Sequence, residues 1–292
     1  MKISVILSNY NGEKFLEEAI CSVLDQDHGD YEFIIVDDGS SDGSPEIIRR
    51  YAADYPERVI SLLEPENRGQ GAGFNQAISR ASGEIVAFID SDDIWMPCKL
   101  SKLEEFVRLA GPAALYQHNL FLMEGQVVTE RLYRPLLCSG DLYGEACATR
   151  RVPAHFVPTS GLAFPRTILE KVLPIPNAFR TCADGYLTRT SFCHGPVASC
   201  TSAWGYYRIH ESNSVFNNPA HDNSAYVRRL LVPALNQYYG TIGVSLRFPL
   251  LDSRFGGDLP WLLVHVSLYD IYSAVMKGLK KRIFREDAKT RS

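Results

Sequence analysis

Short apolar runs alternate with amphipathic stretches along about the first 110 residues of the chain. The runs are rich in β-branched residues and are bounded by turn-forming residues, so they predict four strands, at residues 2–8, 31–38, 58–64 and 83–90. Apolar side chains at helical spacing predict helices at residues 13–25, 69–81 and 98–110, with another that opens at Pro45. Strands that are apolar throughout are buried on both faces. The pattern therefore predicts an α/β fold in which helices cover both faces of a mostly parallel sheet.

The regular alternation breaks down in the second half of the chain, where Gly, Pro and aromatic residues are frequent. Two apolar runs, AALYQHNLFLM and QVVTERLY, flank Glu124 and Gly125 and predict a hairpin there. This half is therefore expected to add antiparallel or mixed strands to the sheet. Helical spacing returns from residue 222 onwards. The predicted division is a main domain and a C-terminal helical extension, at residues 1–215 (with halves 1–112 and 113–215) and 216–292.

Composition excludes several classes of protein. The apolar fraction is 46%, the charged fraction 22% and the net charge −4, which is typical of a globular protein and not of a nucleic-acid binder. Seven cysteines stand at irregular spacing with no C-x-x-C pair, which argues against a disulfide framework or a structural zinc site and suggests reduced thiols. The reduced thiols suggest a cytoplasmic protein, and the N-terminal apolar run is too short for a signal peptide or a membrane span.

Acidic residues directly follow two of the predicted strands. Asp37 and Asp38 end the second strand, and Asp90, Asp92 and Asp93 follow the fourth. The carboxyl ends of parallel strands meet at one edge of a sheet, where such folds bind ligands, so we expect both clusters at that edge. Asp90 and Asp92 share a face of an extended chain and suit a hard divalent cation that also binds phosphate. The alternative for each cluster is a solvated turn that caps the next helix.

The segment NRGQGAGFN is a near match to a dinucleotide-binding loop. Gly69 and Gly71 have the required spacing, but Phe74 stands where the third glycine is needed. The segment also follows the third predicted strand and not the first. The sequence therefore does not support an NAD-binding function, and it contains no Walker-type phosphate loop.

Four segments in succession carry a resemblance to a known family. They are SVILSNYNGEKFLEEAICSVLDQ, FIIVDDGSSDGS, ENRGQGAGFNQAISRASGEIVAFIDSDD and the WMP that follows. In this order they resemble the family 2 glycosyltransferases, closely over about residues 2–110 and more weakly to about residue 215. The resemblance implies the GT-A fold, a Rossmann-like mixed sheet flanked by helices. It also implies that residues 1–112 bind a nucleotide sugar and that residues 113–215 bind the acceptor.

The resemblance also implies an activity. Family members transfer a sugar from a nucleoside diphosphate sugar to an acceptor hydroxyl and invert the anomeric centre. We therefore expect a glycosyltransferase of polysaccharide biosynthesis whose donor is most simply a UDP-sugar and whose acceptor is a glycan or a lipid-linked saccharide. The implied cofactor is Mg²⁺ or Mn²⁺, and no nucleic acid is expected as a partner.

Carried over position by position, the resemblance implies donor-binding residues in the loops after the strands and in the segment YYRIHESNS. They are Ser8, Tyr10, Asp38, Asn67, Gly69, Asn75, Asp90, Ser91 and Arg208. The implied metal ligands are Asp92, Asp90 and His210. Gly69 and Asn75 have the alternative role of shaping the fold, and Asp93 is expected to cap the following helix. Strand alternation places Arg208 and His210 on one face, where both are expected to face the diphosphate.

The resemblance places the catalytic base in the segment TCADGYLTRTSF. Asp184 is followed by Leu187 and Arg189 as in the family's motif, although Ala183 replaces the glutamate that precedes the base in relatives. A carboxylate suits the task of accepting the proton of an attacking hydroxyl. Asp184 has the alternative role of capping the helix that follows it. Ser160, in the segment HFVPTSG, is expected to lie beside the acceptor.

The segment 261–284 has apolar residues at helical spacing and a basic end. Its charged residues argue against a transmembrane span. Two interpretations stay open: peripheral contact with an anionic membrane, or an ordinary helix packed on the domain, which we favour.

Two other functions stay open as alternatives. A sugar-1-phosphate nucleotidyltransferase would need a glycine-rich loop with a basic residue after the first strand, where SNYNGEKF has only Gly12. A non-catalytic nucleotide-sugar-binding protein is disfavoured by the presence of Asp92, Asp184 and His210 together.

Overall fold

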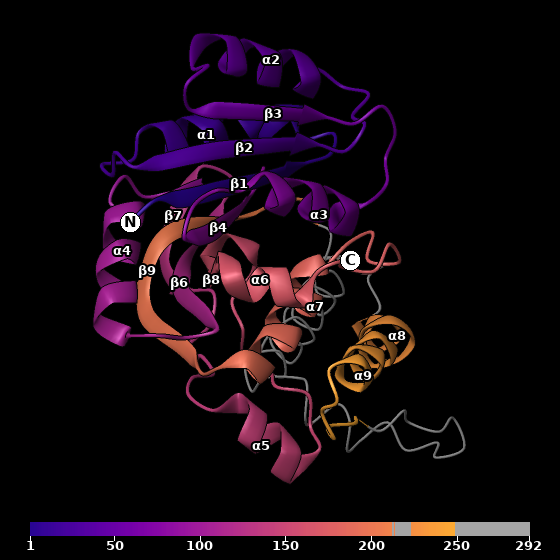
Figure 1. Ribbon diagram of the computed structural model, residues 1–292. Helices are drawn as coiled ribbons and strands as arrows, with labels where there is room; N and C mark the ends of the chain where they lie inside the picture. The colour runs from indigo at the N-terminus through magenta and orange to yellow at the C-terminus, as the bar shows by residue number, and fades with distance from the viewer. Residues whose placement is uncertain (212, 214–222, 249–292) are drawn as a thin grey trace, which may run out of the picture. The chain divides into compact units, whose positions relative to one another are not determined.

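The computed structural model of the chain describes residues 1–211, 213 and 223–248. The strands in these residues are β1 (Ile3–Asn9), β2 (Tyr31–Asp37), β3 (Val59–Leu63), β4 (Ile85–Asp90), β5 (Ile94–Trp95), β6 (Leu115–Glu124), β7 (Val127–Leu132), β8 (Leu162–Pro165) and β9 (Val197–Ile209). All nine belong to one sheet, in the order β3-β2-β1-β4-β8-β6-β9-β5, with β7 paired to β6. Figure 1 shows β3, β2 and β1 lying side by side at one end of this sheet.

The first four strands, β1 to β4, run parallel to one another, as their continuous apolar sequences predict. β1 pairs with β2 on one side and with β4 on the other. The register sets Asn9 opposite Asp37 and Ser8 opposite Asp90. The predicted meeting of the two acidic clusters at one edge of the sheet is therefore confirmed.

Helices cover both faces of the sheet. Those that the structure describes are α1 (Glu13–Leu24), α2 (Ser44–Asp54), α3 (Gln70–Arg80), α4 (Lys99–Ala110), α5 (Leu142–Thr149), α6 (Arg166–Val172), α7 (Ala183–Ser191), α8 (Asn223–Tyr226) and α9 (Val232–Thr241). On one face, Val5 and Leu7 of β1 belong to a core with Leu16 and Ile20 of α1. On the other face, Ile6 belongs to a core that includes residues of α3, α7 and α9. Alternation along β1 thus supplies both cores.

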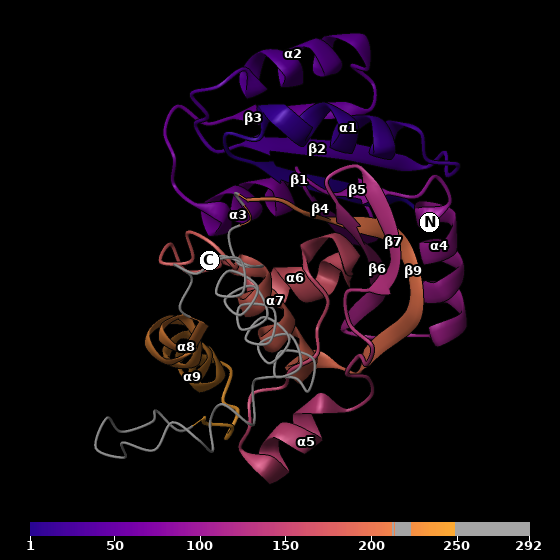
Figure 2. The same ribbon diagram turned by 180° about the vertical axis from the view of Figure 1, so that it is seen from behind.

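The second half of the chain makes the sheet mixed. β8 lies antiparallel between β4 and β6, whereas β9 runs parallel to β6 over most of its length. The hairpin expected around Glu124 and Gly125 is present, because β6 and β7 pair antiparallel up to Glu124 and Val127. Figure 2 shows this hairpin and the short strand β5 from behind. The predicted fold class, an α/β mixed sheet flanked by helices, is confirmed, although the parallel pairings among the described strands are confined to the first four strands and to β6 with β9.

The first helices of the predicted C-terminal extension share a core with the main domain. Leu231, Leu235 and Tyr239 are buried with residues of β1, β4 and α7. Residues 1–249 accordingly form one compact unit. The segment 261–284, for which membrane contact and packing were both open, lies outside the described residues. Within the described part, none of the helices is both long enough and apolar enough to cross a membrane.

Candidate active site

The candidate active site lies where β4 ends. Carboxylate oxygens of Asp90, Asp92 and Asp93 all lie within 4.8 Å of one another. The chain turns here through a hydrogen bond from the Asp93 amide to the Asp90 carbonyl, at 3.2 Å. Three negative charges in one turn repel each other unless protons or a cation compensate them.

The pKa values at this turn reflect that repulsion. Burial, followed by the charges of Asp92 and Asp184, raises the pKa of Asp90 well above 3.8. Burial, followed by the charges of Asp92 and Asp90, raises the pKa of Asp93 well above 3.8. Asp184, in the first turn of α7, is one of the charges that raise the pKa of Asp90. The site therefore carries unbalanced negative charge that a divalent cation would neutralise.

The sequence predicted that Asp93 caps the following helix. This prediction is wrong, because Cys98 occupies the N-cap of α4. Instead, the side chain of Asp93 is 1% exposed and joins two distant segments. It accepts hydrogen bonds from the Ser160 hydroxyl at 2.5 Å and from the Arg208 amide at 2.9 Å. The Ser160 hydroxyl also accepts one from the Asp90 amide at 3.0 Å. Asp93 and Ser160 thus stabilise the turn from its buried side. The carboxylates of Asp90 and Asp92 are left to bind a ligand.

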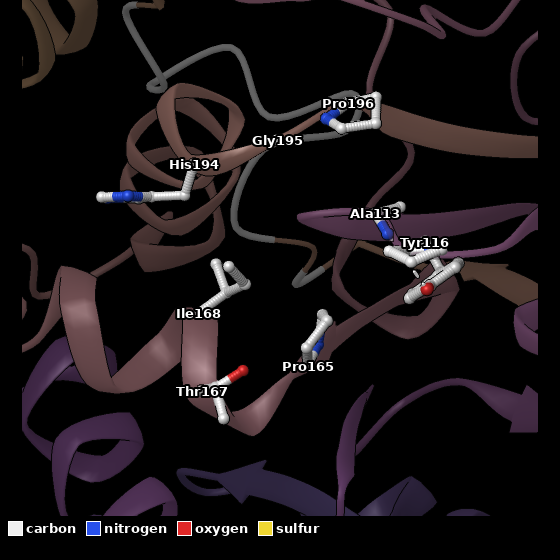
Figure 3. A pocket seen from close by; sticks show the side chains of 9 residues that line it. Ala113, Tyr116, Pro165, Thr167, Ile168, His194, Gly195 and Pro196 are labelled. Carbon is white, nitrogen blue, oxygen red and sulfur yellow. Dashed lines mark hydrogen bonds between the residues drawn. The ribbon is translucent and has the colours of Figure 1, made fainter.

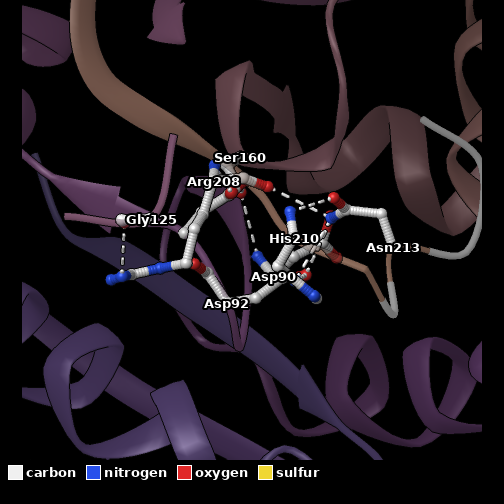
Figure 4. A network of polar contacts seen from close by, with 8 residues as sticks. Asp90, Asp92, Gly125, Ser160, Arg208, His210 and Asn213 are labelled. Carbon is white, nitrogen blue, oxygen red and sulfur yellow. Dashed lines mark hydrogen bonds and ion pairs between the residues drawn. The ribbon is translucent and has the colours of Figure 1, made fainter. Parts of the chain in front are cut away.

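His210 lies against Asp92, as its prediction as a metal ligand requires. Nε2 of His210 is 2.9 Å from Oδ2 of Asp92 (Figure 4). Asn213, which was not singled out from the sequence, donates to the same carboxylate at 3.5 Å and accepts from the His210 amide at 2.7 Å. Asn213 belongs to the segment YYRIHESNS, but no local pattern marks its contact with Asp92, which is 121 residues away in the sequence.

The donor set fits a divalent cation of the Mg²⁺ or Mn²⁺ type. Carboxylates and water suit both ions, and an imidazole is also a ligand for transition metals. Asp92 and Asp90 supply carboxylate oxygens, and His210 supplies a ring nitrogen beside them.

Arg208 does not face the ligand site, contrary to the prediction that placed it beside the diphosphate. Its side chain is 1% exposed. Its guanidinium donates to the carbonyl of Asp92, to the carbonyl of Gly125 and to the carboxylate of Glu18. Strand alternation still holds, because the Arg208 and His210 side chains both contact Phe15, but the internal partners of the guanidinium keep it within the protein.

The end of β1 and the loops after β1 and β4 contain the other residues predicted to bind the donor. Ser8 stands beside Asp90 in the sheet register and is half-buried. Tyr10 follows β1 and is 53% exposed, so its ring is available to a ligand. Ser91 is half-buried, and its hydroxyl lies 2.8 Å from the position that a Cβ on Gly12 would take. These residues border the acidic turn.

A second set of predicted donor-binding residues has its polar atoms engaged within the protein. Asp38 is 4% exposed and accepts from the amides of Arg68 and Gly69, both at 2.7 Å. Asn67 accepts from the guanidinium of Arg180. Gly69 has a φ of +93°, and a Cβ there would lie 2.5 Å from the Cα of Arg180. Only glycine tolerates both the conformation and the close approach.

Asn75 binds a main-chain segment 100 residues away. Its amide donates to the Ile175 carbonyl at 2.9 Å and accepts from the Ile175 amide at 2.8 Å. Of the two roles that the sequence left open for Gly69 and Asn75, both residues therefore perform the structural one.

Asp184 lies in the first turn of α7 and is not its cap, because the N-cap is Cys182, which has a left-handed φ of 56°. Burial raises the pKa of Asp184, and the charge of Arg189 opposes that shift. The hydroxyl of Tyr226 donates to the Cys182 carbonyl at 2.8 Å. Gly185 allows this approach, because a Cβ there would lie 2.4 Å from the Tyr226 oxygen.

A separate pocket of 280 Å³ lies near the start of β4, at the opposite end of this strand from the acidic turn (Figure 3). It is lined by Pro112, Ala113, Tyr116, Pro165, Thr167, Ile168, His194, Gly195 and Pro196. Pro165 pairs with Ile85 at the start of β4, whereas Asp90 ends that strand. The His194 ring is paired with the Tyr238 hydroxyl at 2.6 Å. This pocket therefore takes no part in the acidic site.

Comparison with known proteins points to one family. The model of the family described as "Glycosyl transferase family 2" matches residues 4–171, more than half of the chain. An uncharacterized glycosyltransferase of Nostoc sp. is 38% identical over 217 residues, which cover 73% of this chain and 66% of that protein. The chain thus spans slightly less than two thirds of the length of this curated relative.

Solved structures show the same fold. The chain matches the structure of S. aureus TarS 1-349 in complex with UDP-GlcNAc with a TM-score of 0.59 at 20% identity, covering 82% of this chain and 73% of that TarS chain. It matches the mannosyltransferase PcManGT of Pyrobaculum calidifontis, in complex with GDP-Man and Mn²⁺, with a TM-score of 0.56 at 20% identity. That match covers 85% of this chain and 65% of PcManGT. Both structures support the GT-A architecture.

Proposed function

The chain belongs to glycosyl transferase family 2, and from this premise we propose that it transfers a sugar from a nucleoside diphosphate sugar, with UDP as the nucleotide, to a hydroxyl of a glycan or lipid-linked saccharide. The observation that carries the proposal is the gathering of Asp90, Asp92 and His210 at the edge where the parallel strands end. TarS binds UDP-GlcNAc, and PcManGT binds GDP-Man and Mn²⁺. We infer that the edge of this sheet binds a donor of the same chemical class.

Asp92, Asp90 and His210 would hold the cation. When bound, a divalent cation neutralises charge on the leaving diphosphate. Asp93 and Ser160 hold the turn at Asp90, and Arg208 holds the Asp92 carbonyl, so the geometry of the site would be prepared before the ligand arrives.

The residues beside the acidic turn would bind the nucleoside. Tyr10 presents an exposed ring that can stack on the base, and Ser8 and Ser91 offer hydroxyls next to Asp90. Asp38 acts on this site indirectly, because it holds the backbone of Arg68 and Gly69.

We propose Asp184 as the general base. It lies in the first turn of α7, a helix that packs in the same core as β4, the strand that ends at Asp90. Its own pKa is raised by burial, which makes it a stronger base than an exposed carboxylate. In the proposed reaction the Asp184 carboxylate accepts the proton of the acceptor hydroxyl while that oxygen attacks the anomeric carbon, and the bond from this carbon to the diphosphate oxygen breaks to release the nucleoside diphosphate. Attack from the face opposite the diphosphate inverts that carbon.

The two alternative functions are less well supported. The loop after β1 contains a single glycine, Gly12, and a Cβ there would lie 2.2 Å from Oδ1 of Asn9. This loop is therefore packed tightly and lacks the glycine-rich run that a nucleotidyltransferase would need. Binding without catalysis is disfavoured because Asp184, a half-buried carboxylate in the first turn of α7, is present as a candidate base.

The replacement Asp184→Asn tests the proposed base. We expect transfer to fall by about 10²–10⁴-fold, the usual contribution of general base catalysis, while UDP still raises the melting temperature in the presence of Mn²⁺. Asp141→Asn is the matched control, because Asp141 caps α5 and asparagine caps equally well. Retention of near-normal turnover by Asp184→Asn would exclude Asp184 as the base. Failure of every UDP- or GDP-sugar to stabilise the wild-type protein would exclude the proposed donor class.

A further inference from the structure

The side chain of Arg208 connects the acidic turn to two other segments of the protein (Figure 4). Nε donates to the Asp92 carbonyl at 2.8 Å. One terminal nitrogen donates to the Gly125 carbonyl at 3.3 Å, in the turn of the β6–β7 hairpin. The other donates to Oε2 of Glu18 at 2.7 Å, in α1. One buried guanidinium thus joins α1, the hairpin and the acidic turn.

Burial makes the carboxylate of Glu18 essential to this arrangement. An arginine at 1% exposure has lost its hydration, so its charge must be balanced by a nearby anion. Glu18 supplies that charge, although it is itself 43% exposed. Gln126 also donates to Glu18, at 3.2 Å, which ties the hairpin to the same carboxylate.

The neighbouring turn of α1 contacts the site in a second way. Phe15 precedes Glu18 by three residues and so lies on the same face of the helix. Its ring centroid is 4.7 Å from the Arg208 guanidinium carbon and also 4.7 Å from the His210 ring. The face of α1 that holds Arg208 therefore also packs against His210.

These contacts fix the main chain from which Asp92 projects. The hydrogen bond from Arg208 to the Asp92 carbonyl and the one from the Arg208 amide to Asp93 hold two successive residues of the turn. Asn213 closes the other side, since it donates both to Asp92 and to the Arg208 carbonyl, the latter at 3.1 Å. A metal ligand whose main chain is held in this way needs little reorganisation to bind a cation.

We propose that Glu18 and Arg208 form a positioning pair for the acidic turn, and that the pair sets the affinity of Asp92 for a divalent cation. The proposal rests on the proposed function, in which Asp92 holds that cation. Neither residue touches the cation or the sugar donor. Removal of the Glu18 carboxylate leaves Arg208 without its charge partner, so the guanidinium turns towards water and releases the Asp92 carbonyl.

The test compares Glu18→Ala with Glu17→Ala. The two glutamates are neighbours on α1, but Glu17 pairs with Arg50, and both partners of that pair are 53% exposed. The measurement is the Mn²⁺ dependence of the melting temperature, recorded with UDP at a fixed excess, together with the Mn²⁺ dependence of UDP-sugar hydrolysis. For Glu18→Ala we expect the Mn²⁺ concentration needed for half of the effect to rise by about tenfold or more, as is usual when a partner of a metal ligand is removed. For Glu17→Ala it should stay within about twofold.

A second readout separates positioning from simple loss of stability. Saturating Mn²⁺ should restore the turnover of Glu18→Ala to near that of the wild type, because the ligands themselves are intact. Glu18→Gln, which keeps an acceptor oxygen and the shape of the side chain, should lie between the wild type and Glu18→Ala, and it serves if Glu18→Ala does not fold. Equal Mn²⁺ dependence in the Glu17 and Glu18 variants, or a loss of turnover that no Mn²⁺ concentration restores, would overturn the positioning role alone. A wild-type protein that ignores Mn²⁺ with UDP present would overturn the proposed metal site as well.

Discussion

Two acidic clusters stand at the same edge of the sheet, yet they behave in opposite ways. In the first cluster, Asp37 accepts from the side-chain amide of Asn9 and from both the hydroxyl and the backbone amide of Ser40. Asp38 accepts from the amides of the segment 68–69. Every one of these carboxylate oxygens thus has a donor from the protein itself.

The second cluster has more negative charge than its surroundings compensate. Only Asp93 has both oxygens bound by protein donors, the Ser160 hydroxyl and the Arg208 amide. The pKa values of Asp90 and Asp93 are raised by burial and by the neighbouring carboxylates. Acidic residues after a buried strand therefore indicate either an internal support or a cation site, and the supply of donors around them decides which.

The largest expected difference between the clusters follows from Asp92→Ala. Transfer should fall at least about a hundredfold, because a cation contributes several kcal/mol of transition-state stabilisation. The stabilisation by Mn²⁺ should disappear, while the free energy of unfolding without metal should stay the same or increase, since one of three repelling charges is gone. Turnover assays and urea denaturation measure both effects. Unchanged Mn²⁺ stabilisation would assign the cation to other ligands.

The corresponding change in the first cluster is Asp37→Asn. We expect the free energy of unfolding to fall by about 2 kcal/mol, because the amide nitrogen of the new side chain cannot accept from the donors of Asn9 and Ser40. The Mn²⁺ dependence of the melting temperature should keep its midpoint. Urea denaturation provides the first value and a thermal titration the second. A shifted Mn²⁺ midpoint would show that the two clusters act as one site.

The response to pH should distinguish the second cluster without mutation. The pKa values of Asp90 and Asp93 are raised in the folded protein. At a pH between 3.8, the ordinary pKa of an aspartate, and these raised values, the folded protein therefore retains protons that the unfolded chain has released. The stability that comes from these two groups is therefore lost as pH rises from 3.8 through the folded pKa values. Because a bound cation replaces the protons, the gain in melting temperature from Mn²⁺ should grow with pH over this window. A gain that shrinks as pH rises would contradict this account.

The smallest effect is expected for Ser40→Ala. The hydroxyl donates to Asp37 at 2.6 Å and accepts from Asn9 and from the Asn11 amide. Its loss should lower the free energy of unfolding by about 1 kcal/mol, the usual net contribution of such hydrogen bonds. Denaturation of Ser40→Ala beside Asp37→Asn gives the comparison. A cost larger than that of Asp37→Asn would mean that the hydroxyl, and not the carboxylate, is the centre of this network.

The elements of the fold could be predicted because their signal is local. Apolar alternation and helical spacing within about ten residues give β1 to β4, the first helices and the β6–β7 hairpin. The convergence of Asp37 and Asp90 also follows from sequence, since parallel strands bring their carboxyl ends together.

The roles of buried polar residues could not be predicted in the same way, because their partners are remote in sequence. Arg208 and Glu18 are 190 residues apart, so no local pattern links them. Asp93 was expected to cap a helix, but donors from Ser160 and Arg208 bind it. The sequence identified the acidic edge and His210 correctly as neighbours, and only the packed structure shows which charges the protein satisfies itself.

The contact between Gly185 and Tyr226 has a consequence for the design of hybrid enzymes. Tyr226 belongs to α8, beyond residue 171, where the match to the family model stops. Its hydroxyl holds the backbone of Cys182, two residues before Asp184. A chimaera that joins this sheet to the C-terminal helices of a relative must therefore keep a tyrosine at position 226 and a glycine at position 185. Otherwise the graft would displace the start of α7 even though every residue of the acidic edge is retained.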